Sequence, residues 1–473
     1  MLVRHKHLLL VLQLICVGSL AGGAPSGAGA IKHVITLMME NHSFNNLLGW
    51  LPGIGDVQPS DYNLLNSSDP NSPKLFASDG APFCAMADLL HDFADVTEQV
   101  FGGASTAANM GGFVHNYAAH GGTAAVPMAC FTPQQLPVIS ALCSSFTCAT
   151  HFHSSIPGPT GPNRMMLHAA TTTGYDGGQF DAGPYHMHAR TIYEDLQDGG
   201  FTWRIHWQDF TTAHAITPLS SSPNTSAFIT RDVAFAQFFD ALEHGTLPSY
   251  TLLVPALGPL STSSGVQAPN SQHPAYDVRH GEDLMKQVSI NNAGAHLGTL
   301  HPAATHSPLP QVYDSLRRSS HWNDTLLVLT YDEHGGFWDR QPPPAHVANP
   351  CPTCTPSPYA FEFDRLGVRV PTVFISKYSP RRPDPTLYET ASIPATIREI
   401  FGLKAPPLSP RAAAASTFTS SLSDARDDAP VSLPAACWDC APPCYPPAPL
   451  LTGLGSDMAL MCVCHSLQHD RSH

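Results

Sequence analysis

Five stretches of strand length are apolar along almost their whole length, and they constrain the fold more than any other feature of this chain. They are Ile31–Met39, Phe201–Trp207, Tyr250–Val254, Thr325–Tyr331 and Val368–Ser376. Strands of this kind suit a parallel sheet that is covered on both faces. Helical patterns lie between them, at Thr191–Gln197, Asp232–Glu243, Gln311–Arg318 and Ile393–Phe401. The alternation predicts an α/β fold with a doubly wound, mostly parallel sheet flanked by helices.

The charge content narrows the functional classes. Asp, Glu, Lys and Arg make up 13% of the 473 residues, against an ordinary level of roughly 25%. The net charge is −14, and no cluster of Lys and Arg is present to bind phosphate backbones, so we expect no nucleic-acid partner. The 26 His residues outnumber the 23 Lys and Arg residues. This composition fits an enzyme that uses a metal ion or acid–base catalysis.

The N-terminus has the features of a secretory signal peptide, which we assign to residues 1–23. Arg4, His5 and Lys6 form a basic segment, Leu8–Leu20 is apolar, and small residues follow. A membrane anchor is the alternative, but about 13 apolar residues are too few to cross a bilayer comfortably. We therefore expect a secreted, extracellular protein, or one in the lumen of the secretory pathway.

Composition also divides the rest of the chain. We expect one catalytic domain over residues 31–410, with a surface insertion at about 288–307. Residues 411–473 then form an Ala/Ser/Pro-rich linker and a Cys- and Pro-rich tail, read as a disulfide-linked appendage with a zinc knuckle as the alternative. In the same oxidising compartment, we expect Cys351 and Cys354 to form a structural disulfide rather than a redox or zinc pair.

Polar residues follow two of the predicted strands. Glu40 and Asn41 come directly after the first strand, and Asp332 and Glu333 come after Thr325–Tyr331. Chemistry in a doubly wound sheet lies at the carboxyl ends of its strands. Adjacent carboxylates repel each other unless a cation holds them, and hard cations prefer oxygen ligands. The pattern indicates a metal site, with a helix cap or a solvated acidic turn as the alternatives.

A hydroxyl and two imidazoles could act beside such a site. Thr160 precedes Pro162, a residue suited to the first turn of a helix, so its hydroxyl is expected near a helix N-terminus that favours an anion. There it could attack phosphorus, or it could merely cap the helix. His91 and His273 could bind phosphate or protonate a leaving group, although a lone His is more often structural.

Taken together and in this order, the segments resemble the phosphoesterase family of non-specific, phosphatidylcholine-preferring phospholipases C and related acid phosphatases, within the alkaline-phosphatase-like superfamily. The matching stretches run from about residue 31 to 410, and the most specific are GPTGPNRMMLHAATTTG (158–174) and WNDTLLVLTYDEHGGFWD (322–339). The resemblance implies that Thr160 is the nucleophile and that His91 and His273 are phosphate-binding or acid–base groups. It implies one divalent cation (Ca²⁺, Mg²⁺, Mn²⁺ or Zn²⁺) bound by Glu40, Asn41, Asp332 and Glu333. It assigns phosphate binding to Asn41, Asn163, Arg164 and His334.

The sequence departs from the family pattern at three positions. Thr150 stands where relatives usually have Asp, Thr390 where they have His, and Val254 where they tend to have Glu. If the missing His contributes to phosphate or metal binding, activity or specificity should differ from that of relatives. The nucleophile and metal positions are intact.

The resulting hypothesis is a secreted phosphoesterase of phospholipase C type that hydrolyses phospholipid head groups through a phospho-threonine intermediate. It would act on a phospholipid or a small phosphate ester and make peripheral contact with a membrane. One alternative is an acid phosphatase, a phosphomonoesterase with the same site. Another is a non-catalytic secreted binding protein derived from the enzyme.

Overall fold

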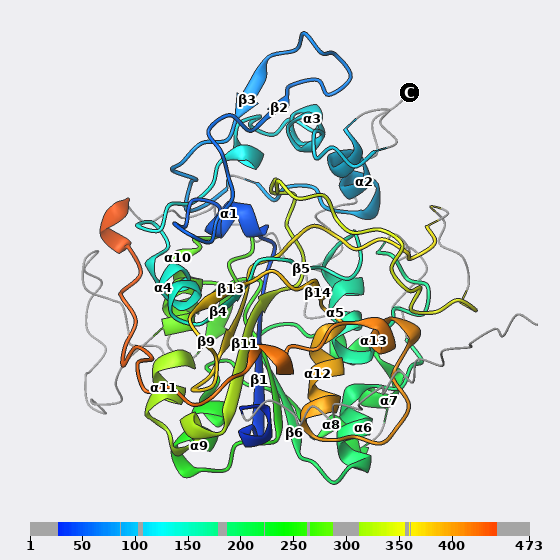
Figure 1. The fold of residues 1–473 in the computed structure, drawn as a ribbon, viewed down its shortest axis with the longest axis vertical. Helices are drawn as coiled ribbons and strands as arrows, with labels where there is room; N and C mark the ends of the chain where they lie inside the picture. Colours follow the sequence, from blue (N-terminus) through cyan, green and yellow to red (C-terminus); the bar gives the residue numbers. More distant parts are fainter. Residues whose placement is uncertain are drawn as a thin grey trace, which may run out of the picture.

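An eight-stranded sheet forms the centre of the protein (Figure 1). The computed structural model describes residues 27–85, 87–102, 107–177, 187–221, 223–262, 265–286, 312–354, 359 and 361–441. The strands lie in the order β13-β4-β12-β11-β1-β8-β6-β7. The first strand of the chain, β1 (His33–Met39), therefore lies inside the sheet with neighbours on both sides.

Five adjacent strands run parallel to one another. Beside β1 they are β11 (Thr325–Tyr331) on one side and β8 (Tyr250–Val254), β6 (Trp203–Trp207) and β7 (Ile229–Arg231) on the other. Every residue of β8 and β11 is buried, as expected for strands covered on both faces. The predicted α/β fold with a mostly parallel sheet is confirmed.

The other half of the sheet contains one strand whose direction differs from the prediction. β12 (Thr372–Ile375) lies within the predicted parallel strand Val368–Ser376, but it runs antiparallel to β11 and to β4 (Thr147–Ala149). The expected direction was wrong because an antiparallel strand inside a covered sheet is as apolar as a parallel one. β13 (Arg382–Asp384) forms the edge, parallel to β4.

Helices cover both sides of the sheet (Figure 1). One side carries α4 (Pro137–Ser145), α9 (Ala236–His244), α10 (Arg279–Lys286) and α11 (Val312–Arg318). The other carries α5 (Thr160–Ala169), α6 (Ile192–Asp198), α12 (Ser392–Ile400) and α13 (Pro410–Ala414). The described part of the chain has no helix long and apolar enough to cross a membrane.

Local sequence explains where these helices begin and end. At the start of α6, Thr191 and Glu194 form a capping box that satisfies two backbone N–H groups. α9 starts later than predicted because the Asp232 carboxylate accepts from the N–H groups of Gln237 and Phe238 and so holds the chain ahead of the helix. α9 ends where Gly245 adopts a left-handed conformation, as a C-terminal glycine commonly does.

The chain between α1 (Phe44–Leu48) and α4 forms a layer beyond the carboxyl ends of the central strands, which we call the cap (Figure 1). It contains the antiparallel pair β2 (Tyr62–Leu64) and β3 (Lys74–Phe76), and the helices α2 (Phe93–Phe101) and α3 (Phe113–Ala119). Its apolar core includes Val96, Phe113, Met128 and, from the chain after β11, Trp338. The cap was not predicted from the sequence, because its strands are short and lack an apolar run.

Three disulfides join pairs of described cysteines that are close in the chain. They are Cys143–Cys148, Cys351–Cys354 and Cys437–Cys440, whereas Cys130 is a free, buried thiol. The predicted pairing of Cys351 with Cys354 is confirmed. The signal peptide, the insertion at 288–307 and the last cysteines of the tail lie outside the described residues.

Residues 411–441 pack against the domain that precedes them. Phe418 stacks on Phe374 of β12, with ring centroids 4.3 Å apart, and Leu422 and Leu433 belong to the main core. The buried Arg411 guanidinium donates to Glu389 at 3.0 Å. The packed structure therefore continues past the position near 410 where composition suggested a linker.

Buried histidines give the fold a predictable dependence on pH. Burial lowers the pKa of His42 to about 4 and the pKa values of His153, His168 and His334 to about 3. In the unfolded chain such groups titrate near ~6.5. Below that pH the unfolded state binds more protons than the native state, so the free energy of unfolding should fall by about 1.4 kcal/mol per pH unit for each of these side chains.

Measured by urea unfolding, the free energy of unfolding should fall by about 1.4 kcal/mol for each of these side chains between pH values of about 7.5 and about 5.5, because only the lower part of this interval lies below ~6.5. His168→Gln should make this fall in the free energy of unfolding smaller by the contribution of one histidine side chain. His244→Gln is the control, because the His244 ring is exposed to solvent. If the free energy of unfolding of the His168 variant fell with pH as much as that of the wild type, the pH dependence would not come from the lowered pKa of the buried histidines.

Candidate active site

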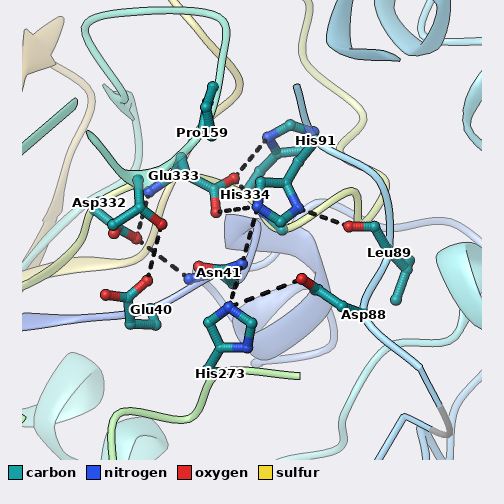
Figure 2. Close-up of polar contacts among 12 residues, drawn as sticks. Glu40, Asn41, Asp88, Leu89, His91, Pro159, His273, Asp332, Glu333 and His334 are labelled. Carbon is teal, nitrogen blue, oxygen red and sulfur yellow. Dashed lines mark hydrogen bonds and ion pairs between the residues drawn. The ribbon is translucent and has the colours of Figure 1, made fainter. Parts of the chain in front are cut away.

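Four polar residues come together where β1 and β11 end (Figure 2). Glu40 and Asn41 follow β1, Asp332 and Glu333 follow β11, and all four are fully buried. The Asn41 backbone N–H donates to Asp332 Oδ1 at 3.3 Å, and the His42 N–H donates to the Glu333 carbonyl at 3.1 Å. The two strands are parallel and in register up to their last residues, which is why residues almost 300 positions apart become neighbours.

Gly335 allows the two loops to approach each other closely. Its φ is 63°, and a Cβ atom at this position would lie 2.1 Å from the Asn41 carbonyl oxygen. Asn41 itself has φ 56°, a left-handed conformation that Asn tolerates better than most residues. The backbone on both sides of the site is therefore fixed by residues that few others could replace.

Thr160 lies at the N-terminus of α5, beside the carboxylates. Its hydroxyl donates to Glu40 Oε2 at 3.3 Å. The first N–H groups of a helix have no partner within the helix, and they favour negative charge. The structure thus places the predicted nucleophile against a predicted metal ligand, with helix donors next to it.

Asn163 organises the loop that leads to Thr160. Its side-chain N–H groups donate to the carbonyls of Ile156, Gly158 and Pro159 at 3.0–3.1 Å, and its carbonyl accepts from the Ile156 N–H at 2.9 Å. These contacts use the hydrogen-bonding capacity of the amide within the loop. In this structure the expected phosphate-binding residue holds the loop that leads to Thr160.

Arg164, also expected to bind phosphate, is buried between two carboxylates. Its guanidinium donates to Glu40 Oε1 and, at 3.0 Å, to Asp332 Oδ2. Burial lowers the pKa of Arg164, but the two carboxylates raise it more, so the side chain stays charged. Arg164 supplies part of the positive charge that this cluster needs.

The cluster still carries more negative than positive charge. Burial raises the pKa of Glu40 well above its ordinary value; Arg164 opposes this shift, and Asp332 and Glu333 add to it. Burial also raises the pKa of Glu333. Asn41 Oδ1 and Glu333 Oε1 are buried without a hydrogen bond. Buried oxygens in this state fit a hard divalent cation, so the residues present suit the expected metal ion.

His91 and His273 face the Asn41 amide (Figure 2). Nε2 of each ring lies 3.3 Å from Asn41 Nδ2. Each Nδ1 lies close to a carbonyl, that of Leu89 for His91 and that of Pro274 for His273. A carbonyl can only accept a hydrogen bond, so Nδ1 carries a hydrogen and Nε2 is the nitrogen presented to the site.

The two histidines differ in exposure and in electrostatic surroundings. The His91 side chain is 10% exposed and that of His273 24% exposed. Burial lowers the pKa of His91, but Glu333 and Asp88 raise it more, to about 9. Asp88, whose Oδ2 lies 3.8 Å from His273 Nε2, was not identified from the sequence. It lies in a segment without periodicity or motif, so no sequence signal was available.

A second set of polar contacts holds the loops that carry the site residues. His334, expected to bind phosphate, is fully buried, and its Nε2 lies 2.8 Å from Gln99 Oε1 in the cap. His42 stacks on Phe337, and its Nε2 donates to the Gln272 carbonyl at 2.9 Å. These side chains connect the loops after β1 and β11 to the cap and to the loop that carries His273. His42, Gln99 and Gln272 were not identified in this role from the sequence.

The departures from the family pattern have structural partners of their own. The Thr390 hydroxyl is buried and accepts from the Ser155 backbone N–H at 3.3 Å. The Thr150 carbonyl accepts from Arg369 at 2.9 Å, and the Thr150 hydroxyl donates to the Asp384 carbonyl at 3.2 Å. Thr390 thus binds the loop that precedes Thr160, whereas Thr150 lies at the β4–β13 edge of the sheet.

Comparison with known proteins defines the class of this protein: the chain is a hydrolase that acts on phosphate ester bonds, of phospholipase C type. The model of the Phosphoesterase family matches residues 31–404, and the chain belongs to this family.

Relatives from plants and bacteria are similar over most of their length. Non-specific phospholipase C3 of Arabidopsis thaliana is 32% identical, with 88% of this chain and 78% of the relative covered. Non-specific phospholipase C1 of the same plant is 33% identical, covering 86% and 74%. Phospholipase C B of Mycobacterium tuberculosis is 26% identical, covering 82% and 76%.

Solved structures give weaker similarities. The lipoteichoic acid synthase LtaP of Listeria monocytogenes has a TM-score of 0.35 at 11% identity, covering 80% of this chain and 74% of its own. Phosphonate monoester hydrolase of Agrobacterium radiobacter has a TM-score of 0.32 at 11% identity, covering 79% and 74%.

The close approach at Gly335 leads to a mutational prediction. Gly335→Ala should reduce turnover at least about a hundredfold and lower the free energy of unfolding by about 2–4 kcal/mol, because the new Cβ must displace the Asn41 backbone. Gly402→Ala is the matched control, since Gly402 has φ 60° but no atom within 4 Å of an added Cβ. The control should show only the cost of the left-handed conformation, about 1 kcal/mol. Equal losses of activity in the two variants would contradict the role of the close approach.

Proposed function

We propose that this protein is a secreted phospholipase C in which the Thr160 hydroxyl is the nucleophile. The observation that carries the proposal is the position of that hydroxyl. It lies 3.3 Å from Glu40 Oε2 at the N-terminus of a ten-residue helix, next to a buried carboxylate cluster. A threonine that served only as a helix cap would not need its hydroxyl against a buried carboxylate of this cluster.

Glu40, Asn41, Asp332 and Glu333 would hold one divalent cation. The support is the excess of buried acceptor oxygens, including Asn41 Oδ1 and Glu333 Oε1, which accept no hydrogen bond; His91 Nε2 lies 3.6 Å from Glu333 Oε1. When bound, such an ion would lower the pKa of a nearby hydroxyl and neutralise phosphate oxygens. The oxygen ligands fit Ca²⁺, Mg²⁺ or Mn²⁺ and also permit Zn²⁺.

The chain's own residues would then direct two displacements at phosphorus. The Thr160 hydroxyl gives its proton to the Glu40 carboxylate that accepts its hydrogen bond, and its oxygen forms a bond to phosphorus while the bond to the glycerol oxygen breaks. His273, in its protonated form, donates a proton to that leaving oxygen. Water next attacks the phospho-threonine and gives a proton back to His273, while the Thr160 oxygen leaves phosphorus, regains its proton from Glu40 and releases the phosphorylated head group. His91 and the first N–H groups of α5 bind the phosphate oxygens, and Asn163 keeps the loop before Thr160 in place.

A phospholipid substrate is supported by the surface of the cap. The β2–β3 pair exposes Phe76, Tyr62 and Leu65, with 51%, 43% and 38% of their surfaces accessible. Exposed aromatic side chains of this kind suit the interface of a lipid layer. The alternative is a phosphomonoesterase with the same site, and the remaining alternative is a non-catalytic binding protein.

Secretion is part of the proposal. It is supported by the signal-like residues 1–23 and by the disulfides among the described residues, which persist in oxidising compartments.

Substitution of the nucleophile tests the mechanism. Thr160→Ala should lower the hydrolysis of phosphatidylcholine vesicles at least about a thousandfold, because it removes the hydroxyl that is proposed to form the covalent intermediate. Thr160→Ser keeps the hydroxyl and should retain measurable turnover. With a substrate labelled in its phosphate group, this variant should form a labelled phospho-serine.

The same assay separates the alternatives when a soluble phosphomonoester is measured beside the vesicles. Hydrolysis of the monoester alone would favour the acid phosphatase, and no turnover of either substrate would favour the binding protein. Activity of Thr160→Ala within tenfold of the wild type would contradict the role of Thr160.

Removal of the cation provides a second test. Dialysis against a chelator should abolish turnover, because the carboxylates of Glu40, Asp332 and Glu333 would then repel the phosphate. Readdition of Ca²⁺, Mg²⁺, Mn²⁺ or Zn²⁺ singly should restore activity and identify the ion. Circular dichroism should confirm that the chelated protein stays folded. Full activity after all metal has been removed would exclude a role for the cation in catalysis.

A further inference from the structure

A second group of potential metal ligands lies at the opposite end of the central strands. His33 begins β1, and Asp324 directly precedes β11. The backbone N–H groups of Lys32 and His33 both donate to the Asp324 carbonyl, at 2.8 and 3.1 Å. His321 lies one turn earlier, in the 3-10 helix Ser320–Asn323. The seven residues of β1 separate this group from Glu40, a distance of about 20 Å at ~3.3 Å per residue.

The side chains of His33, His321 and Asp324 converge. One ligand atom from each residue lies within 4.8 Å of those of the other two. The two imidazole rings are in edge contact, with centroids 4.4 Å apart, and His321 Nδ1 is 3.8 Å from Asp324 Oδ1. Two imidazoles and one carboxylate form a donor set that zinc commonly takes, with a fourth position left for water.

Hydrogen bonds around the group leave ligand atoms free. His33 Nδ1 lies 2.8 Å from the Pro248 carbonyl, so Nδ1 carries the hydrogen and Nε2 keeps its lone pair. His321 Nε2 and Asp324 Oδ1 are buried and make no hydrogen bond of ordinary geometry, although the Gly245 carbonyl faces the His321 ring. Burial, together with the neighbouring His33, lowers the pKa of His321, which favours the neutral form that binds metals.

We propose that His33, His321 and Asp324 form a zinc site separate from the phosphoesterase site, which joins the start of β1 to the turn before β11. Solvent can reach it, because the side chains of His321 and Asp324 are 11% and 22% exposed. Lys32 is the competing cation, since its Nζ lies 3.3 Å from Asp324 Oδ2. Its side chain is 74% exposed, and it contacts the oxygen opposite to the free Oδ1, so it does not block the site.

Zinc counting and thermal unfolding test the site in the full chain. After chelation, the wild type and the variants His33→Gln, His321→Gln and Asp324→Asn are incubated with Zn²⁺ and freed of excess metal. Each variant should retain one zinc fewer than the wild type. Zinc should raise the melting temperature of the wild type by about 2–5 °C and leave those of the variants almost unchanged. Turnover should stay within about twofold of the wild type in all three variants.

Two further variants distinguish zinc bound at this site from zinc bound elsewhere in the protein. His244→Gln is the matched control: His244 also lies beside an aspartate, Asp240 at 3.1 Å, but this pair offers only two ligands, so zinc content should not change. An Asp332→Asn background removes a ligand of the catalytic cluster and should leave the zinc of the triad in place. Equal zinc content in the wild type and the three triad variants, or a wild type whose melting temperature does not respond to zinc, would overturn the proposal.

Discussion

The parallel pairing of β1 with β11 is the interaction on which the rest of the structure depends. Its register brings the ends of both strands to the same point, so that Glu40 and Asn41 meet Asp332 and Glu333, and all four side chains are buried. Packing on both faces of the sheet holds this geometry, because every residue of β11 is buried. The cap, the α5 loop and the His273 loop then attach to these strand ends through Gln99, Arg164 and His42.

The parts of the fold that could be predicted are those in which one segment carries its own signal. Apolar runs located β1, β8 and β11, and glycine marked the end of α9. The direction of β12 could not be predicted, because burial on both faces erases the difference between parallel and antiparallel strands. The cap was missed for a related reason: its short strands are stabilised by contacts with distant segments such as the one that contains Trp338.

The site residues also divide into those that a local sequence signal predicts and those that depend on contacts with distant segments. The pattern of residues at strand ends was sufficient to select Glu40, Asn41, Asp332 and Glu333, and the structure brings all four together with Thr160, His91 and His273. It was not sufficient to separate residues facing the cluster from those that hold its loops. Asn163 and His334 occupy family positions, yet their hydrogen bonds go to the surrounding chain. Asp88 lies close to His273 because the chain of the cap passes beside the site, and no local sequence pattern predicts this course of the chain.

Arg164 gives the cluster a fixed charge balance. With Glu40, Asp332 and Glu333 ionised, the Arg164 guanidinium and the protonated His91 ring leave the cluster with one net negative charge. A divalent ion in the proposed site would change this to one net positive charge. That charge would match the single negative charge of a phosphodiester and leave the second charge of a phosphomonoester uncompensated, and burial of an uncompensated charge is costly. The buried Arg164 would therefore help the proposed site to favour singly charged diesters over doubly charged monoesters before any contact with the alcohol group is made.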